Sequence, residues 1–351
     1  MPKRFIQKFT GNKPGISYCL AIGFLLITVF LGVGVGTVQV SFKEMVAIFG
    51  NHLLPLSFQT DPMLDNIVIN IRLPRVVLAG LVGASLALAG AAFQGLLRNP
   101  LADPYTLGVS SGASVGAVIV IFFQLSFPII GLLTLPIASI IAAFITIFIV
   151  LFFARKIEPS MKVETIILTG IIFSSFLGAF LSLIIALSNQ ELREIIGWLL
   201  GSVSMRGWNY IWIILPFFLI GSFLLMLNTR ELNAMTFGEE RAQHLGVNVE
   251  KRKQLVLIAG SLLTGAAVAV SGTIGFVGLV IPHLTRLLWG PDHTHLLPLS
   301  TVVGGGFLIL ADLLARTIIQ PAELPIGVIT ALIGAPVFAG ILMRRRLESR
   351  G

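Results

Sequence analysis

Apolar segments of about 20 residues recur along this chain, and short polar joints separate them. About 20 residues of α-helix span the hydrocarbon core of a bilayer, whereas a membrane strand needs only about 10. Because no water is available inside the bilayer, backbone N–H and C=O groups there must bond to one another, and a helix satisfies them within one segment. The segment length therefore predicts a helical membrane protein.

Composition supports this class and excludes others. Of the 351 residues, 56% are hydrophobic and the mean hydropathy is +0.95, whereas soluble domains contain roughly 45 to 50% apolar residues. The net charge of +8 does not indicate nucleic-acid binding, because the basic residues are scattered over membrane-flanking joints and the termini, where they orient membrane helices. The single cysteine, Cys19, excludes a disulfide within the chain.

Ten apolar segments account for the pattern, so the expected fold is an all-α membrane protein with ten transmembrane helices in a single domain over residues 1–351. The N-terminus resembles a signal peptide, but the apolar run from Ile16 to Val35 is longer than the apolar region of such a peptide and is expected to remain as the first span. The expected spans are about 16–36, 76–96, 105–124, 131–154, 165–187, 208–229, 254–272, 274–288, 296–314 and 326–343.

The segments between the spans predict the orientation. With the N-terminus inside, 18 of the 24 Lys and Arg residues flank the inner ends of the spans, as the positive-inside rule requires. Both termini and residues 230–253 are then expected in the cytoplasm. Residues 37–71, 188–207 and 316–325 lie outside, and short helical patterns such as Gln190–Leu200 are expected there along the membrane surface.

Two segments of the chain resemble each other. The octad Gly83–Gly90 matches Gly265–Gly272, and Pro100 and Pro282 keep the same offset of 182 residues. The two segments belong to spans of opposite direction, so the match predicts an inverted repeat of five spans plus five, an arrangement typical of transporters. A chance likeness between two helices rich in small residues is the alternative.

Small residues recur at helical spacing in these two spans, which lets helices approach closely. A pathway lined by small side chains would show the same pattern, so both interpretations stay open. The residues concerned are Gly83, Ala87, Ala91, Gly95, Gly265, Ala269 and Gly272.

Catalytic and cofactor-binding patterns are missing from the sequence. There is no GxxxxGK[ST] motif, so the chain is not expected to bind a nucleotide through a P-loop. His283, His293 and His295 gather near Asp292, but histidines in a short loop are more often solvated than metal ligands. We therefore expect no catalytic residue, no metal site and no cofactor. The sequence also lacks the chain of buried carboxylates that a proton-driven carrier needs.

Three arginines lie on the outer side, against the general charge bias. Arg72 and Arg75 flank the start of the second span, and Arg316 precedes the last. Asp312 is four residues before Arg316, so the two are expected to pair on one helix face. The three arginines are expected either to receive carboxylates from a partner protein or to anchor to phospholipid headgroups.

Residues 230–253 form a polar segment with nine charged residues, in a chain that is only 11% charged. Gly238, Ala242, Leu245 and Gly246 are spaced so that a short helix could lay a face of small residues into a groove on a partner. Glu239 and its charged neighbours would form the rim of this face. We expect this segment to be a cytoplasmic partner-binding element.

Six ordered strings carry a resemblance to a known family: IRLPRVVLAGLVGASLALAGAAFQGLLRNPLADPYTLGVSSGASVGA, GWLLGSVS, FGEERAQHLGV, GTIGFVGLVIPHLTRLL, LADLLAR and ELPIGVITALIGAPVF. They are similar to the permeases of iron-siderophore and cobalamin ABC importers, the FecCD type. The resemblance extends from about residue 65 to the end of the chain.

The resemblance implies a permease subunit of a type II ABC importer, in the cytoplasmic membrane of a bacterium. It implies ten helices per subunit, a second permease subunit, a pair of cytoplasmic ATPases that hydrolyse ATP, and an extracytoplasmic substrate-binding protein. By the same match, Arg72, Arg75 and Arg316 would meet glutamates of the binding protein. The residues that would contact the ATPase are Gly238, Glu239, Ala242, Leu245 and Gly246.

The expected function is import of a metal chelate, with an iron(III)-siderophore as the first candidate. A haem or cobalamin permease of the same family is the alternative. A secondary transporter is the alternative from another class, and only the internal repeat supports it. The strings do not identify the chelate, nor whether the second permease subunit is a copy or a homologue.

Overall fold

The computed structural model describes residues 14–54, 57–126 and 131–348, and this part of the chain is helical with no strand. Seven of its helices are long and apolar enough to cross a membrane, so the expected all-helical membrane protein is confirmed. Six of them are α2 (Pro14–Gly34), α7 (Thr134–Ile157), α8 (Val163–Leu187), α10 (Gly207–Leu227), α13 (Val249–Ser271) and α15 (His293–Thr317). The seventh is a continuous helical stretch of 35 residues, formed by α4 (Pro62–Asn66), the π-helix η1 (Ile67–Arg72) and α5 (Leu73–Leu96).

Three shorter apolar helices lie where the remaining predicted spans were expected: α6 (Val109–Phe122), α14 (Val277–Trp289) and α16 (Ile326–Glu348). Their apolar lengths are 10–17 residues, less than the thickness of a bilayer requires of an isolated helix. The count of ten spans therefore stays a prediction. The basic residues that precede Pro14 lie outside the described residues.

Short helices connect the spans. The helix predicted at Gln190–Leu200 is confirmed as α9 (Leu192–Leu199), and its place on the outer side stays a prediction. The prediction of a further helix at 316–325 is wrong, because α15 continues to Thr317 and is followed by turns. Prolines explain this, since Pro321 and Pro325 have no backbone donor for a helical hydrogen bond. The other short elements are α3 (Phe42–Leu53), η2 (Pro104–Leu107), η3 (Gly131–Leu133), α11 (Thr229–Thr236) and α12 (Glu239–His244).

Polar side chains fix where several helices begin. Ser41 and Glu44 form a capping box at α3, in which each side chain bonds to the other residue's backbone N–H. Asn248 accepts a hydrogen bond from the Lys251 N–H at the start of α13, and Asp292 accepts one from the Thr294 N–H at the start of α15. These caps satisfy backbone donors that have no partner within the helix.

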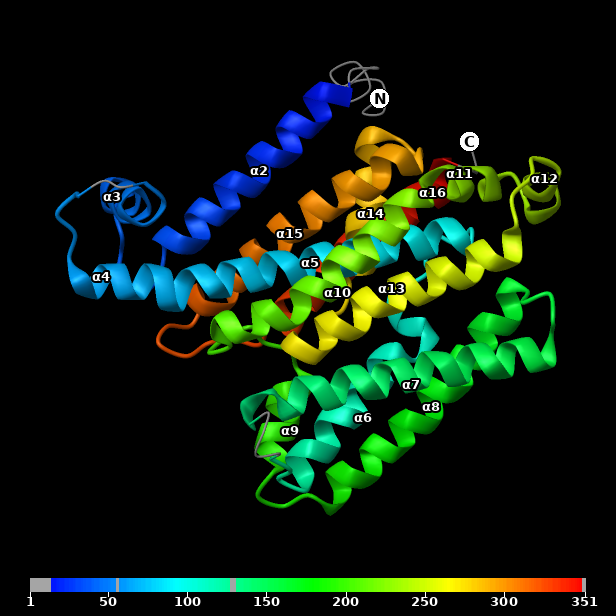
Figure 1. Ribbon diagram of the computed structural model, residues 1–351, viewed down its shortest axis with the longest axis horizontal. Helices are drawn as coiled ribbons and strands as arrows, with labels where there is room; N and C mark the ends of the chain where they lie inside the picture. Colours follow the sequence, from blue (N-terminus) through cyan, green and yellow to red (C-terminus); the bar gives the residue numbers. More distant parts are fainter. Residues whose placement is uncertain (1–13, 55–56, 127–130, 349–351) are drawn as a thin grey trace.

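The helix α5 runs through the middle of the bundle, with α10, α13, α14 and α15 packed against it (Figure 1). Most of α5, α13 and α15 is buried, whereas only a small part of α2, α8 and α10 is. These three helices carry many large exposed apolar side chains, such as Phe176 on α8 and Phe223 on α10. The bundle thus has a central layer of buried helices and an outer layer that faces lipid or another subunit.

Glycines let the central helices approach one another closely. A Cβ on Gly83 would lie 2.3 Å from the Gly304 carbonyl oxygen of α15, and a Cβ on Gly90 would lie 1.9 Å from the Gly278 carbonyl oxygen of α14. Both neighbours are backbone atoms and cannot move aside. At such short distances dispersion forces hold the helices together. These forces matter in a membrane because lipid is as apolar as the side chains, so no hydrophobic driving force favours helix association.

The seven small residues singled out in the sequence are all buried. Gly95 packs on the His293 ring, and Gly272 faces the Trp198 carbonyl oxygen, which a Cβ would approach to 2.1 Å. These contacts place the residues at helix contacts. That any of them lines a pathway stays a prediction.

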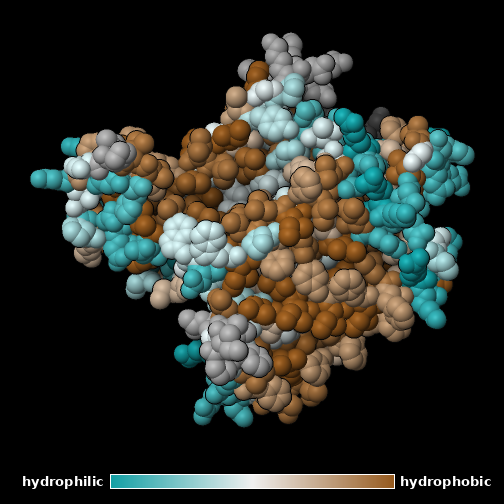
Figure 2. Space-filling model, viewed as in Figure 1, coloured by the Kyte–Doolittle hydropathy of each residue, from teal (hydrophilic) through white to brown (hydrophobic). Residues whose placement is uncertain are grey.

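Polar and apolar residues are segregated along the long axis. Figure 2 shows teal, hydrophilic residues at the right, over α11 and α12, and at the left, over α3 and α4, with brown residues on the surface between them. The long helices run across this apolar zone from one polar end to the other (Figure 1). The apolar zone is the surface that a bilayer would cover.

Candidate functional site

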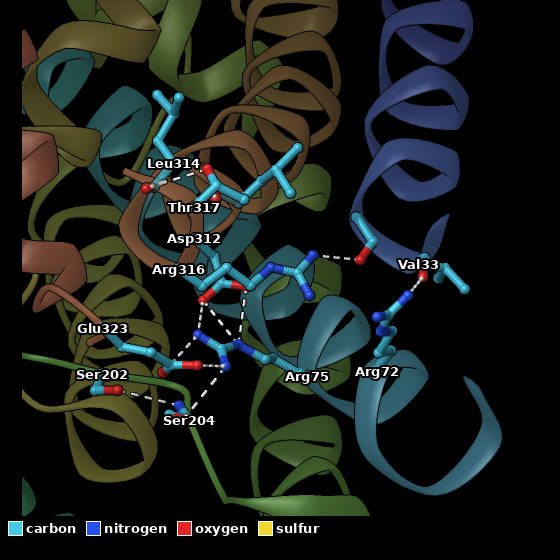
Figure 3. Close-up of polar contacts among 12 residues, drawn as sticks. Val33, Arg72, Arg75, Ser202, Ser204, Asp312, Leu314, Arg316, Thr317 and Glu323 are labelled. Atoms are coloured by element: carbon cyan, nitrogen blue, oxygen red, sulfur yellow. Dashed lines mark hydrogen bonds and ion pairs between the residues drawn. The ribbon is translucent and has the colours of Figure 1, made fainter. Parts of the chain in front are cut away.

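The polar end beside α3 and α4 contains an arginine–carboxylate cluster built around Arg75. Arg75 lies in the first turn of α5, and its Nε and Nη2 atoms donate to the buried carboxylate of Asp312 at 3.0 and 2.9 Å. Its Nη1 and Nη2 atoms also donate to Glu323 at 2.8 and 3.1 Å (Figure 3). One guanidinium thus joins α5 to α15 and to the loop between α15 and α16, through charge-assisted bonds.

The other two arginines hold the end of α2. Arg72 donates to the carbonyl oxygens of Val33 and Gly34 at 2.9 and 3.0 Å, and also to that of Val38. Arg316 donates to the Gly32 carbonyl oxygen, and its Nε lies 3.8 Å from an Asp312 carboxylate oxygen. The predicted pair of Asp312 and Arg316 is therefore confirmed. The carbonyls at a helix C-terminus carry partial negative charge, which suits a guanidinium.

Charge within this cluster does not cancel. Arg75 and Arg316 share the Asp312 carboxylate, and Glu323 gives Arg75 a second one. Arg72 bonds only to backbone carbonyl oxygens, which carry no net charge. Arg72 and Arg316 are buried, so their guanidinium groups serve the fold first. Glu323 is the accessible carboxylate, with 40% of its side chain exposed. Burial raises the pKa of Glu323, but the hydrogen bond and the positive charge of Arg75 lower it by more. The pKa of Glu323 is therefore below its ordinary value.

The opposite polar end carries the charged segment, which folds as α11 and α12. Gly238 and Gly246 bound α12 with φ angles of +110° and +84°, where other residues would be strained. Phe237 and Leu245 are 65% and 70% exposed. The segment therefore presents two large apolar side chains on a polar surface, an arrangement that suits an apolar anchor at a protein interface.

One residue of the predicted small-residue face differs from the expectation. Ala242 is fully buried and faces the rest of the chain. The reason is that α12 is a short helix folded back on α11 and α13, so its apolar inner side needs a small residue there. Phe237 takes the place on the exposed face that the sequence interpretation gave to Ala242. Its signal, an isolated aromatic residue in a charged segment, was present in the sequence.

Charged residues of the segment bind it to the bundle. Glu239 lies 2.6 Å from the Nζ atom of the buried Lys253, which also donates to the Met161 carbonyl oxygen at 3.1 Å. Glu231 lies 3.1 Å from Arg252. These pairs connect α11 and α12 to α13 and to the loop between α7 and α8. A displacement of α11 and α12 would therefore also displace α13 and that loop.

Asn233 connects α11 to the start of α15. Its Oδ1 atom accepts from the His293 backbone N–H at 2.9 Å and lies 2.8 Å from His293 Nδ1. Its Nδ2 atom donates to Asp292 at 2.7 Å. His293 and Asp292, considered in the sequence for a metal, thus serve a helix contact. The described residues hold no group of three His, Cys, Asp or Glu side chains placed to bind a metal ion.

Tyr105 holds the joint between α13 and α14. Its hydroxyl donates to the Ile274 carbonyl oxygen at 2.9 Å and accepts from the Ile274 N–H at 3.0 Å. Gln94 of α5 donates to the Leu279 carbonyl oxygen at 3.1 Å in the first turns of α14. The sequence interpretation recognised the glycine-rich joint but gave these side chains no role.

The described residues thus form an all-helical membrane bundle with a charged cluster at one polar end and an exposed helical segment at the other. The model of the FecCD transport family matches residues 24–344. The chain belongs to this family.

Relatives of known class cover nearly the whole chain. The uncharacterised ABC transporter permease YvrB of Bacillus subtilis is 60% identical over 351 residues, which are 100% of this chain and 99% of YvrB. The cobalamin import system permease BtuC of Halobacterium salinarum is 43% identical, over 84% of this chain and 78% of that protein. More distant relatives are described as permeases for haemin and for iron(3+)-hydroxamate.

A solved structure has the same fold. It is described as an inward-facing conformation of an ABC transporter assigned to the metal-chelate type, and its chain is 34% identical to this one. The TM-score is 0.83, with 95% of this chain and 100% of the other covered. The chain is thus a permease of the ABC-transporter type.

The Arg75 cluster predicts a large loss of stability when its buried carboxylate is neutralised. Asp312→Asn leaves Arg75 and Arg316 without their shared counter-charge, which costs about 3 kcal/mol or more. Glu323→Gln removes an exposed partner and should cost about 1 kcal/mol or less. Thermal unfolding of the two purified variants in one detergent measures the difference, and equal unfolding temperatures would contradict this account of the cluster.

Proposed function

We propose that the chain is the transmembrane permease subunit of an ATP-driven importer that carries an iron(III)-siderophore across a bacterial cytoplasmic membrane. The observation that carries the proposal is the likeness to ABC permeases over nearly the whole chain, both in sequence and in fold. The permease relative for iron(3+)-hydroxamate supports the siderophore. Cobalamin is the second candidate, favoured by the 43% identity to a cobalamin permease.

The proposed assembly has two permease subunits, a pair of cytoplasmic ATPases and an extracytoplasmic binding protein. Ten spans per subunit, in an inverted repeat, require α6, α14 and α16 to cross the bilayer together with the seven longer helices. The start of α2 and the end of α16 lie toward the same side of the molecule as α11 and α12 (Figure 1). This supports cytoplasmic termini and a cytoplasmic position for α11 and α12.

The proposed mechanism is alternating access, and this chain breaks no covalent bond. The binding protein presents the chelate at the end of the bundle that carries the Arg75 cluster. ATP binding and hydrolysis on the separate ATPase move α12. The ion pair of Glu239 with Lys253 and the hydrogen bonds of Asn233 pass this movement to α13 and α15. The joint held by Tyr105 lies where α13 meets α14.

Uptake in a strain that lacks the gene tests the substrate and the energy source. Cells that regain the chain should import a labelled iron(III)-siderophore from a panel that also contains haemin and cobalamin, and import should stop when ATP is depleted. Import of cobalamin alone would select the second candidate. Uptake that survives ATP depletion and collapses with a protonophore would show a secondary transporter instead.

We expect α11 and α12 to make an apolar contact with the ATPase through Leu245. The proposed coupling set also contains Gly238, Glu239 and Gly246, together with Ala242, which is buried and supports α12 from its inner side. Leu245→Asp should weaken association at least about tenfold, because an interface anchor contributes about 2 kcal/mol or more. Leu245→Met keeps an apolar side chain and is the matched control. Copurification of the ATPase from detergent measures both, and equal recovery with the two variants would contradict the assignment.

Docking of the binding protein is proposed at Arg72, Arg75 and Arg316, whose surplus positive charge fits an incoming carboxylate. Changing all three to lysine keeps the counter-charge of Asp312 but removes the planar fork that binds a carboxylate through two bonds, so it should weaken association while ATPase assembly remains. Arg193→Lys, at an exposed arginine on α9, is the control. Glu323→Gln removes the carboxylate that now occupies Arg75, and it should tighten association up to about fivefold. Unchanged binding in a folded triple variant, measured by surface plasmon resonance, would contradict docking at this cluster.

A further inference from the structure

The helix α3 has an apolar surface wider than the protein covers. Met45 and Ile48 are buried against the bundle. Phe42, Val46 and Leu53 are 65%, 49% and 78% exposed. At about 100° per residue, these three lie within about 40° of one another around the helix axis and form one stripe beside the buried face.

The opposite side of α3 is polar. Lys43, which is exposed, lies about 60° or more away from every residue of the stripe, and Asn51 lies further round the helix. A helix with an apolar face and a polar face binds at an interface between an apolar phase and water. The helix α3 therefore has three faces: an apolar face packed on the bundle, an exposed apolar face and a polar face.

The axis of α3 lies across the spans. Figure 1 shows α3 end-on, whereas α2, α5 and α15 are seen from the side and extend across the picture. It lies at the polar end of the bundle that also holds Arg72, directly after the end of α2. A helix in this position and orientation is parallel to the membrane plane, at the level where the apolar zone ends.

The exposed stripe continues the lipid-facing surface of α2. The Phe42 ring packs against the ring of Phe30, with 5.2 Å between their centroids. Phe30 and Leu31 are exposed on α2, one of the helices long and apolar enough to span the membrane. The apolar surface of the span thus turns without a break onto α3.

We propose that α3 is an interfacial anchor whose stripe of Phe42, Val46 and Leu53 inserts into the outer boundary between lipid headgroups and acyl chains. The occupant of the surface is the bilayer itself, because the stripe is continuous with the exposed apolar surface of α2, a helix long and apolar enough to span the membrane. The last turn of α2 and the loop that leads to α3 supply the Val33 and Val38 carbonyls that bind Arg72. The anchor therefore fixes the depth of this arginine, whatever the transported substrate is.

Spin labels at matched positions on α3 test the proposal in the full chain. A Cys19→Ser background removes the native thiol, and Val46→Cys and Lys43→Cys each receive one nitroxide label in nanodiscs of phosphatidylcholine and phosphatidylglycerol. Collision with oxygen, which concentrates in lipid, is compared with collision with a water-soluble nickel chelate. The ratio of oxygen to nickel collisions should be at least about fivefold higher at 46 than at 43, as expected for an apolar face in the interface.

Two outcomes would overturn the proposal. Equal ratios at the two positions would mean that the stripe faces water. Exclusion of both reagents at 46 would mean that protein covers it, and spin–spin broadening in addition would identify a second copy of the chain. Phe42→Cys and Leu53→Cys repeat the measurement along the stripe, so the result does not depend on one variant that folds poorly.

Discussion

Close backbone contact around α5 is the constraint on which the rest of this structure depends. The helices of the bundle have no hydrophobic reason to leave lipid for one another, so dispersion forces at short range must hold them. Two glycine contacts bring the helix backbones this close, because no side chain separates them: Gly83 with Gly304, and Gly90 with Gly278. With α14 and α15 held against α5, Asp312 comes within reach of Arg75. The charged cluster is therefore a consequence of glycine contacts along the helix.

The two polar ends use charge in different ways. At the Arg75 end, buried and half-buried groups pair with one another, and the arginines outnumber the carboxylates by one. At the α12 end, ion pairs such as Glu239 with Lys253 hold the segment in place, and the exposed surface is apolar at Phe237 and Leu245. One end thus presents positive charge close to its surface, and the other presents apolar side chains on a polar surface.

Much of the fold could be predicted because its signals are local. Span length and apolar composition predicted the long helices, and four-residue spacing predicted the pair of Asp312 and Arg316 within one helix. The partner-binding set could be predicted only in part. Ala242 was placed on an exposed face, but its burial depends on how α12 folds against α11 and α13. The bond of Glu323 to Arg75 joins residues that are 248 positions apart, and no spacing rule reaches that far.

The sequence by itself determined that this chain is a helical membrane protein, where its long helices lie and which family it resembles, because each of these follows from residues that are near one another in the chain. Only the tertiary structure decided what the polar side chains do. Asn233 holds the start of α15, Tyr105 holds Ile274, and Arg72 holds the end of α2. A buried polar group takes whichever partner the packing of distant helices brings within hydrogen-bond distance, and that packing is not written in any local pattern.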